Sequence, residues 1–531
     1  MTNAQQNSGA AEKADVAIIG GGLAGLTLAL QLRQRRDDLH VVVLERRREA
    51  PPQSIHTVGE STVEIGAHYL GGVLGQAEHL REKHLSKFGL RLFFGASDGD
   101  LANADEVGAS FPLETPTYQV DRGTLEAHLA DEARRLGVEI RNGVRIGDVC
   151  LNGTRHRVGW RDGNEERALE PRWLIDTASR ASPLKRHLNL AADNDHDGSA
   201  VWFRVAEKIR VDEWSSDADW LARTGNHKRW LSTNHLMGPG YWVWLIPLST
   251  GATSVGIVAD PALHAPAELR SYDHVLRWLD KHQPRLAGEL RNCDLLDFHQ
   301  LGRYSHGCKQ VFSDDRWALS GESGVFLDPY YSPGTDFIAF SNSMLTDLVA
   351  RERDGADMRL HSRLYQQMYF SFYRDTLQLY QGQYPGFGDS HLMALKTVWD
   401  FAYYWGILAC LFFNGAMTDL DAMADVRNDV LLTQKNNRNL QRLFRERAAK
   451  RLTLPESGRF IDLAAMPLMV RLNAQLCTPV EGAELGTRIR ENVAVLDDLA
   501  RVVESLLVGN STDAAVPSEA AMVADLRQRL A

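Results

Sequence analysis

The chain has 531 residues, a formal net charge of −10 and 44% hydrophobic residues. This composition is that of an ordinary globular protein with more than one lobe, and the negative charge offers no basic surface for nucleic acid. The five cysteines are scattered and never spaced as C-x-x-C, so neither a disulfide framework nor a metal site is indicated. A cytoplasmic location is expected.

Residues 1–13 are polar and lack an apolar core, which predicts a disordered N-terminal lead rather than a signal peptide. Residues 98–106 are acidic and contain Gly and Ala, which predicts a solvated loop. The most apolar stretch, residues 398–413, is too short for a membrane span and is interrupted by Asp400. We expect no membrane span, and we interpret this stretch as a buried helix or as one wall of a substrate cavity.

A nucleotide-binding pattern lies close to the N-terminus. Residues 15–19 are an apolar run typical of a strand, and residues 26–32 are typical of a helix. Gly20, Gly22 and Gly25 lie between them at G-x-G-x-x-G spacing. Glycine at these positions allows a tight turn, close approach of the backbone to a pyrophosphate, and packing of the helix on the strand.

A second predicted strand, residues 40–44, ends in Glu45. A carboxylate at the end of this strand can accept hydrogen bonds from ribose hydroxyls. Together with the glycines, Glu45 predicts a bound dinucleotide, and this motif alone leaves NAD and FAD open.

Later segments resemble the flavoprotein monooxygenase superfamily and favour FAD. Arg122 comes before an amphipathic helix, as does the arginine that contacts the cofactor in that superfamily. Ser61 lies in a Gly-Glu-Ser-Thr segment that looks like the flavin-contacting strap, and Val149 ends a predicted strand similar to the one behind the adenine. The resemblance implies that these three residues contact FAD.

Two further segments resemble the superfamily but depart from its pattern. Ser179 stands where the Asp-Ala-Ser-Gly-Arg turn usually has glycine. Glu322 stands where the family has the aspartate of a Gly-Asp pair against the ribityl chain. The longer acid can still reach the cofactor, so Glu322 is the expected cofactor ligand.

The segment Trp242-Val-Trp-Leu-Ile-Pro247 resembles the W-x-W-x-I-P motif of flavin-dependent halogenases. In that family the motif separates the flavin from the substrate chamber. The resemblance implies that Trp242, Trp244, Ile246 and Pro247 form the wall of a tunnel, which halide oxidation products cross and an organic substrate does not. The competing interpretation is an aromatic strand that packs in a core.

Residues 326–334 match the F-x-x-P-x-x-S-x-G pattern of the phenol-type and carrier-protein-type halogenases. The resemblance places a halide on the turn Ser332, Pro333, Gly334 and Thr335, and it also brings Thr335 to the cofactor. Pro333 has no N–H to donate, so the amides of Gly334 and Thr335 are the expected halide donors. Tyr331 occupies the position of a glutamate in tryptophan halogenases, which argues against free tryptophan as the substrate.

Lys87 is the expected catalytic residue. It lies between the strap and the Trp motif and directly precedes an aromatic-glycine pair, as in the family. An ammonium can hydrogen-bond hypohalous acid, or an amine can form a chloramine, and either fixes the electrophilic halogen beside one carbon of the substrate. In isolation the same residue would be interpreted as a surface lysine.

The resemblance implies a two-component halogenase. A separate flavin reductase supplies FADH2, which forms a C4a-hydroperoxide with oxygen, and chloride or bromide is oxidised to hypohalous acid and relayed to Lys87. The product is a halogenated electron-rich ring, either a phenol or a pyrrole, free or tethered to an acyl carrier protein. Two alternatives remain: an NAD(P)H-dependent FAD aromatic hydroxylase of the same fold, and a catalytically silent flavin-binding protein.

The predicted fold class is α/β, with a Rossmann-type FAD-binding domain, an inserted mixed β-sheet substrate domain and a mainly helical C-terminal region. Residues 14–350 are expected to form the core, with the substrate wall around residues 200–260, and residues 351–531 to cap the substrate. The aromatic-rich helix predicted over residues 363–380 is expected to pack in the core rather than to line a pocket.

Overall fold

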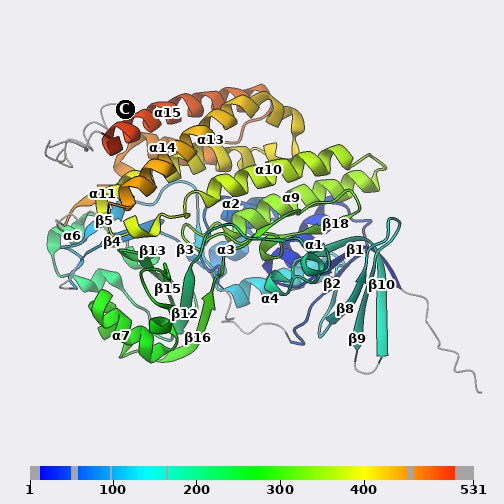
Figure 1. Cartoon of the computed structure of the whole chain (residues 1–531), viewed down its shortest axis with the longest axis horizontal. Coiled ribbons are helices and arrows are strands. Elements are labelled where there is room, and N and C mark those ends of the chain that lie inside the picture. The colour runs from blue at the N-terminus through cyan, green and yellow to red at the C-terminus, as the bar shows by residue number, and fades with distance from the viewer. Residues whose placement is uncertain (1–11, 50–57, 96–98, 163–164, 451–457, 509–531) are drawn as a thin grey trace, which may run out of the picture.

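The computed structural model describes residues 12–49, 58–95, 99–162, 165–450 and 458–508. Two β-sheets lie side by side, and a layer of helices from the C-terminal half of the chain lies across them (Figure 1). This arrangement agrees with the predicted class: a Rossmann-type sheet, an inserted mixed sheet and a mainly helical C-terminal region.

The first sheet is the nucleotide-binding one. Its five parallel strands, in spatial order, are β7 (Glu139–Arg141), β2 (Val41–Leu44), β1 (Glu12–Ile19), β10 (Glu165–Asp176) and β18 (Trp317–Leu319). Two antiparallel strands extend the sheet: β9 (Arg157–Asp162) pairs with the first half of β10, and β8 (Arg145–Cys150) pairs with β9. The central strands read as continuous apolar runs because helices cover both faces of a parallel sheet.

The predicted disordered lead, residues 1–13, is wrong at its last two residues, which belong to strand β1. The strand begins at Glu12, and Glu12 and Lys13 pair with Leu169 and Glu170 of β10. These two residues are polar and exposed, so their sequence carried no apolar signal for a strand. Residues 1–11 of the predicted lead lie outside the described residues.

The second sheet has eight strands. Their spatial order is β16 (Leu295–Gly302), β12 (Ser199–Val205), β15 (Thr253–Ala259), β14 (Tyr241–Pro247), β13 (Thr233–Gly238), β4 (Leu90–Phe94), β5 (Asp105–Gly108) and β19 (Phe460–Asp462). Residues 200–260 therefore supply only the middle of this sheet. Two short two-stranded ladders complete the strands: β3 (Leu85–Ser86) with β6 (Tyr118–Gln119), and β11 (Ala191–Ala192) with β17 (Gly307–Cys308).

Strand β5 corrects the predicted acidic loop. Asp105 and Glu106 are buried in this strand rather than solvated. The Glu106 carboxylate accepts hydrogen bonds from the guanidinium groups of Arg91 and Arg229, which are also fully buried. Residue 98, at the start of the predicted loop, lies outside the described residues.

The helices in the N-terminal half are mostly short, apart from the two that pack on the first sheet. They are α1 (Leu23–Arg35), α2 (Glu64–His68), α3 (Ala77–Lys83), α4 (Arg122–Arg135), α5 (Pro183–His187), α6 (Ala218–Ala222), α7 (Tyr272–His282) and α8 (Pro284–Leu290). Helix α4 is capped by Asp121, whose side chain accepts from the Thr124 N–H.

The helices in the C-terminal half form the covering layer. They are α9 (Gly334–Arg353), α10 (Arg359–Leu377), α11 (Ser390–Tyr403), α12 (Cys410–Phe413), α13 (Leu420–Ala448), α14 (Pro467–Ala474) and α15 (Ala483–Val508). A π-helical segment, Tyr404–Ala409, joins α11 to α12, and a second one, Tyr69–Val73, follows α2. None of the helices in the described ranges has the length and apolar character needed to cross a bilayer.

The expected boundary at residue 350 does not separate two lobes. Helix α9 runs through it, and β19 pairs in parallel with β5 of the second sheet. The described residues of the C-terminal segment therefore pack in the same core as the segment before it. A single strand of three residues has too short a pattern to be found in a sequence of this length.

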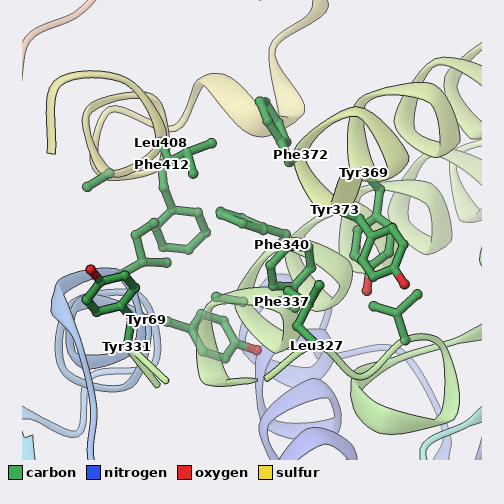
Figure 2. Close-up of a cluster of buried hydrophobic side chains, with 14 of the residues drawn as sticks. Tyr69, Leu327, Tyr331, Phe337, Phe340, Tyr369, Phe372, Tyr373, Leu408 and Phe412 are labelled. Carbon is green, nitrogen blue, oxygen red and sulfur yellow. The ribbon is translucent and has the colours of Figure 1, made fainter. Parts of the chain in front are cut away.

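The aromatic helix α10 packs in the core, as predicted, but the end of the predicted range does not follow the prediction, because Thr376, Leu379 and Tyr380 line the second cavity described below. Figure 2 shows its Tyr369 and Phe372 beside Phe337 and Phe340 of α9 and Phe412 of α12. The rings of Phe337 and Tyr369 meet edge to face at 5.6 Å, and those of Phe340 and Phe412 at 5.7 Å. This cluster gives rigid backing to one side of α9, the helix that begins at the predicted halide turn.

Candidate functional site

A cavity of about 740 Å³, called the flavin cavity below, runs from the carboxyl ends of the first sheet to the second sheet. In an open α/β sheet this edge is where nucleotides bind. Thirteen of the sequence-predicted residues line the cavity: Gly20, Gly22, Glu45, Ser61, Arg122, Trp242, Trp244, Ile246, Glu322, Ser332, Pro333, Gly334 and Thr335.

The glycine turn between β1 and α1 has a different constraint at each glycine. Gly20 has φ +107°, and a Cβ on it would lie 2.9 Å from the Thr177 carbonyl. A Cβ on Gly25 would lie 2.0 Å from the Gly20 oxygen, so Gly25 serves helix packing and lies outside the cavity lining. A Cβ on Gly22 would meet no atom within 4 Å, because this residue opens directly into the cavity. The turn is therefore a cradle that a phosphate group fits.

Glu45 lies at the end of β2, as predicted, and its carboxylate organises the turn. One oxygen accepts from the Gly21 N–H at 2.6 Å, and the other accepts from the Arg47 N–H at 2.7 Å. The acid thus fixes the backbone that a pyrophosphate would approach, in addition to lying beside the cavity where a ribose would bind.

The cavity has a basic lining that the motif search did not find. Arg46, Arg47, Arg145 and Arg186 line it together with Arg122. Only the run of arginines after Glu45 offered a sequence signal. The guanidinium of Arg122 donates to the Val58 carbonyl at 2.7 Å and to Glu126 at 2.6 Å, while its Nε is buried without a partner among the described residues. The donor set suits the phosphates of FAD.

Val149 does not line the flavin cavity. It lies near the end of β8, and the cavity is lined by Val144, Arg145 and Ile146 at the start of that strand. The predicted adenine-side strand is thus present, with its contacting residues several positions earlier. A bulge in the β8–β9 ladder between Ile146 and Val149 shifts the register, so the alternation of faces could not be counted from the sequence.

Trp242 and Trp244 are two residues apart in β14, so both side chains lie on the same face, with ring centroids 5.6 Å apart. The Trp242 indole donates to the Tyr384 hydroxyl at 3.1 Å, and the Trp244 indole donates to the Ser254 hydroxyl at 3.2 Å. Both indoles are buried, and they line the flavin cavity but not the second cavity described below. Pro247, the last residue of β14, is outside that lining.

The Asp328 carboxylate fixes Trp242 through a hydrogen-bonded tyrosine. One of its carboxylate oxygens accepts from the hydroxyls of Tyr384 and Tyr304, each at 2.7 Å, and lies 2.6 Å from Nε2 of His196. Because Tyr384 is also the acceptor for Trp242, the carboxylate fixes the indole through one intermediate. Asp328 belongs to the predicted halide motif, so the motif and the wall are one hydrogen-bonded unit.

The predicted halide turn has an unusual backbone. Tyr331 and Ser332 have φ +67° and +58°, a left-handed conformation that non-glycine residues seldom adopt and that concentrates at functional sites. The strain turns the chain so that α9 begins at Gly334, with Pro333 before it. The amides of Gly334 and Thr335 are in the first turn, where backbone N–H groups have no helical partner and the helix dipole is positive.

A second cavity, of about 270 Å³, lies beside the flavin cavity and is called the substrate cavity below. Among the described residues, Pro333 and Phe337 alone line both, so the halide turn and Phe337 form the boundary between them. The apolar stretch 398–413 supplies one wall of the substrate cavity, as predicted, through Phe401, Tyr404, Trp405 and neighbouring residues. Part of this wall is the π-helical segment Tyr404–Ala409, a distortion that is frequent at functional sites.

Lys87 lines the substrate cavity and reaches towards the flavin cavity. Its Nζ donates to the Ser61 hydroxyl at 2.9 Å and to the Thr62 carbonyl at 3.0 Å. Burial lowers the pKa of Lys87 to about 8, against the opposing effect of the nearby Glu64 and Asp336 carboxyls. An ammonium has three N–H donors, so one remains for a group inside the cavity.

Four ionisable residues that line the two cavities were not predicted. Glu64, Asp336 and Asp400 line the substrate cavity, and His235 lines the flavin cavity next to Trp242. Asp336 directly follows the halide turn, and Asp400 interrupts an apolar stretch, so each left a weak trace in the sequence. Glu64 and His235 left none, because only the fold brings them near Lys87.

A surface cluster with the ligand spacing of a cation site is formed by Glu12, His40 and Glu139. None of the three lines the flavin cavity or the substrate cavity. All three side chains are exposed, and the Arg141 guanidinium binds both carboxylates at 2.6 Å. A guanidinium already supplies the positive charge that the two acids need, so this group is a surface ion-pair network.

The comparisons with known proteins agree with this geometry. The FAD dependent oxidoreductase family matches residues 15–96. The flavin-dependent halogenase chlA of Dictyostelium discoideum is 25% identical over 475 residues, covering 79% of this chain and 76% of the relative. A 1H-pyrrole-2-carbonyl-[peptidyl-carrier protein] chlorinase of Pseudomonas fluorescens is 26% identical over 340 residues, covering 60% and 72%.

Solved structures share the fold. The halogenase PltM in complex with phloroglucinol and FAD superimposes with a TM-score of 0.65 at 18% identity, covering 93% of this chain and 96% of that one. The flavin-dependent brominase Bmp2 has a TM-score of 0.57 at 21% identity, covering 70% and 87%. The chain is therefore similar in sequence to flavin-dependent halogenases, shares the fold of solved ones, and carries an N-terminal segment of the FAD dependent oxidoreductase family.

Proposed function

We propose that this chain is an FADH2-dependent halogenase that chlorinates or brominates a small electron-rich aromatic compound. One observation carries the proposal. Lys87 lines the substrate cavity while its Nζ hydrogen-bonds Ser61, a residue of the flavin cavity. A single side chain thus connects two otherwise separate chambers, which is the arrangement that a diffusible oxidised halogen requires.

FAD is the cofactor that the flavin cavity fits. The glycine turn and the arginines would hold its pyrophosphate, and Glu45 lies where the adenosine ribose would bind. Reduced FAD bound there would supply, with oxygen, the oxidant that converts halide to hypohalous acid. The remaining contributions are those of the chain's own residues.

The chain separates oxidation from substitution. Gly334 and Thr335 would hold the halide on backbone amides at the positive end of α9, and Pro333 and Phe337 form the boundary it must cross. Trp242 and Trp244 are fixed by hydrogen bonds and keep an aromatic substrate out of the flavin cavity. The free N–H of the Lys87 ammonium would then bind the oxygen of hypohalous acid and direct the halogen to one carbon.

The same geometry disfavours direct hydroxylation. A hydroxylase must place its substrate beside the flavin ring, whereas here the second chamber is separated by the turn from Ser332 to Thr335 and by Phe337. The catalytically silent alternative gains no support from the departures at Ser179 and Glu322, because these two residues hydrogen-bond each other in the lining of the cavity.

A free hydroxyarene is a better candidate substrate than a carrier-bound pyrrole. Helix α11, the π-helical segment Tyr404–Ala409 and Leu463 build one side of the substrate cavity, and the fold of PltM covers 93% of this chain, compared with 70% for Bmp2. Reduction of the flavin is assigned to a separate reductase. The five cysteines are all free, which supports a reducing, cytoplasmic location.

The test is an assay of purified chain with FAD, a generic flavin reductase, NADH and bromide, offered a panel of phenols, indoles and pyrroles. Mass spectrometry would detect the paired isotope pattern of bromine. A brominated product that requires bromide supports the proposal. A hydroxylated product without bromine would replace it with the hydroxylase, and the absence of product with free and carrier-tethered rings would replace it with the silent flavoprotein.

A further inference from the structure

Among the ionisable side chains that line the substrate cavity, Lys87, Glu64 and Asp336 come from three separate elements. Lys87 follows β3, Glu64 begins α2 and Asp336 lies in the first turn of α9. Within the described part of the chain, no ion pair within 4.0 Å joins Lys87 to either acid. The ammonium therefore faces the two carboxyls across space that a ligand can enter.

Asp336 is already committed to holding the fold. One of its oxygens accepts from the Gly66 N–H at 2.9 Å, and the other accepts from the Tyr404 hydroxyl at 2.9 Å. The same hydroxyl accepts from the Ile65 N–H at 3.0 Å. Asp336 thus ties α9 to α2 and to the π-helical segment, and both of its oxygens have fixed donors.

Glu64 is less firmly hydrogen-bonded than Asp336. Its Oε1 accepts one long hydrogen bond, 3.3 Å, from the Asn473 side chain. The residue is only partly buried, and it lines the cavity among aromatic walls that include Phe337, Phe401 and Trp405. Burial raises the pKa of Glu64, while the charge of Lys87 opposes the increase. The Asn473 amide and the Trp405 indole are the side-chain donors that act on this carboxylate, and in such apolar surroundings a ligand that brings a further donor is favoured.

We propose that Glu64 accepts the hydroxyl proton of a neutral hydroxyarene and thereby selects this class of substrate and orients its ring towards Lys87. The inference rests on the proposed function, because hypohalous acid must reach Lys87 from the flavin cavity. An aromatic carboxylate would bring a further negative charge beside Glu64, so the cavity discriminates against it.

The proton and electron balance is complete. The substrate O–H bond breaks and its proton passes to the Glu64 carboxylate, while the oxygen electron pair enters the ring. The ring carbon forms a bond to the halogen as the halogen–oxygen bond of hypohalous acid breaks, and the Lys87 ammonium gives a proton to the departing hydroxide, forming water. The amine then takes the proton from the halogenated carbon, and Glu64 returns its proton to the product oxygen.

The test measures equilibrium binding to the oxidised protein, in the absence of reductase and halide. Calorimetry would compare resorcinol with benzoate for the unaltered protein, Glu64→Gln and the matched control Glu114→Gln, which makes the same change at an exposed acid of the same cavity lining. Glu64→Gln should weaken resorcinol binding by about tenfold, as expected for a lost hydrogen bond to a charged group, and should strengthen benzoate binding. Glu114→Gln should change neither.

A second variant, Glu64→Asp, guards against a general disturbance of the cavity. It keeps the charge, so it should preserve the preference for resorcinol over benzoate even if both affinities fall. An unchanged resorcinol-to-benzoate ratio in Glu64→Gln, or loss of the preference in Glu64→Asp, would overturn the inference. Binding needs no turnover, so selective binding without any halogenated product would contradict the proposed function and leave this inference standing.

Discussion

The Ser179 hydroxyl donates a hydrogen bond to the Glu322 carboxylate in the lining of the flavin cavity. These are two of the positions at which the chain departs from the pattern of related flavoproteins, and the hydrogen bond joins them. Ser179 also has φ +53°, where glycine would be unstrained. The two departures are therefore coupled, because the hydroxyl of Ser179 fixes the longer side chain of Glu322.

Restoring either residue alone should weaken FAD binding. Ser179→Gly removes the hydroxyl, and we expect the affinity for FAD to fall about fivefold to tenfold, the effect of one hydrogen bond. Glu322→Asp shortens the acid away from Ser179 and should act similarly. The double variant should bind FAD better than the sum of the two losses predicts, because the two positions are coupled. Fluorescence titration with FAD checks this, and strictly additive losses would contradict the coupling.

The glycine turn gives a matched pair of variants. Gly22→Ala places a methyl group in open cavity space, so the stability of the flavin-free protein should be unchanged while FAD affinity falls about tenfold or more. Gly25→Ala places a methyl group 2.0 Å from the Gly20 oxygen and should destabilise the flavin-free protein by about 1–3 kcal/mol. Thermal unfolding with and without FAD distinguishes the two. Equal effects of both variants on the flavin-free protein would show that the turn is packed differently.

Lys87 should reduce the stability of the fold. Burial lowers its pKa from 10.5 to about 8, so the folded chain holds a proton less tightly than the unfolded chain does. The cost is complete below pH 8, shrinks as the pH rises from 8 towards 10.5, and is absent above that. Lys87→Met should therefore stabilise the protein at neutral pH, by up to about 3 kcal/mol. Denaturant unfolding at pH 7 and pH 10 checks the sign, and a destabilised variant at pH 7 would refute it.

The rate of halogenation should fall as the pH rises through about 8, because the Lys87 ammonium donates the proton that hypohalous acid needs. The carboxyl of Glu64 raises the pKa of Lys87, so Glu64→Gln should move the midpoint of this fall to lower pH. Product formation measured across the pH range with hypobromous acid supplied directly isolates this step. A rate that rises with pH would instead favour a chloramine formed by the neutral amine.

Much of the flavin cavity could be predicted because its motifs are local. Gly20, Gly22 and Gly25 lie within one turn, and Glu45 follows one strand later, so spacing alone carries the information. Lys87 was found by its place between two motifs. Val149 was misplaced because a bulge changes the register of β8, which no count of alternating residues reveals.

The substrate cavity could be predicted only in part, because distant segments build it. Glu64, Asp336 and Asp400 come from α2, α9 and α11, and only tertiary packing brings them to one chamber. Glu106 illustrates the same limit. Its acidic segment is typical of a solvated loop, yet its partners Arg91 and Arg229 bury it in a strand.

The central claim is that Lys87 transfers oxidised halogen from one cavity to the other. Its most direct test compares the unaltered protein with Lys87→Met, supplied with FAD, reductase, NADH and bromide, and measures two products in the same reaction: the brominated arene, and free hypobromous acid captured by a small-molecule scavenger. The variant should consume bromide and release hypobromous acid to the scavenger while brominated arene falls by a factor of a hundred or more, on the order of a lost general acid. Brominated arene at the unaltered level in Lys87→Met would contradict the account.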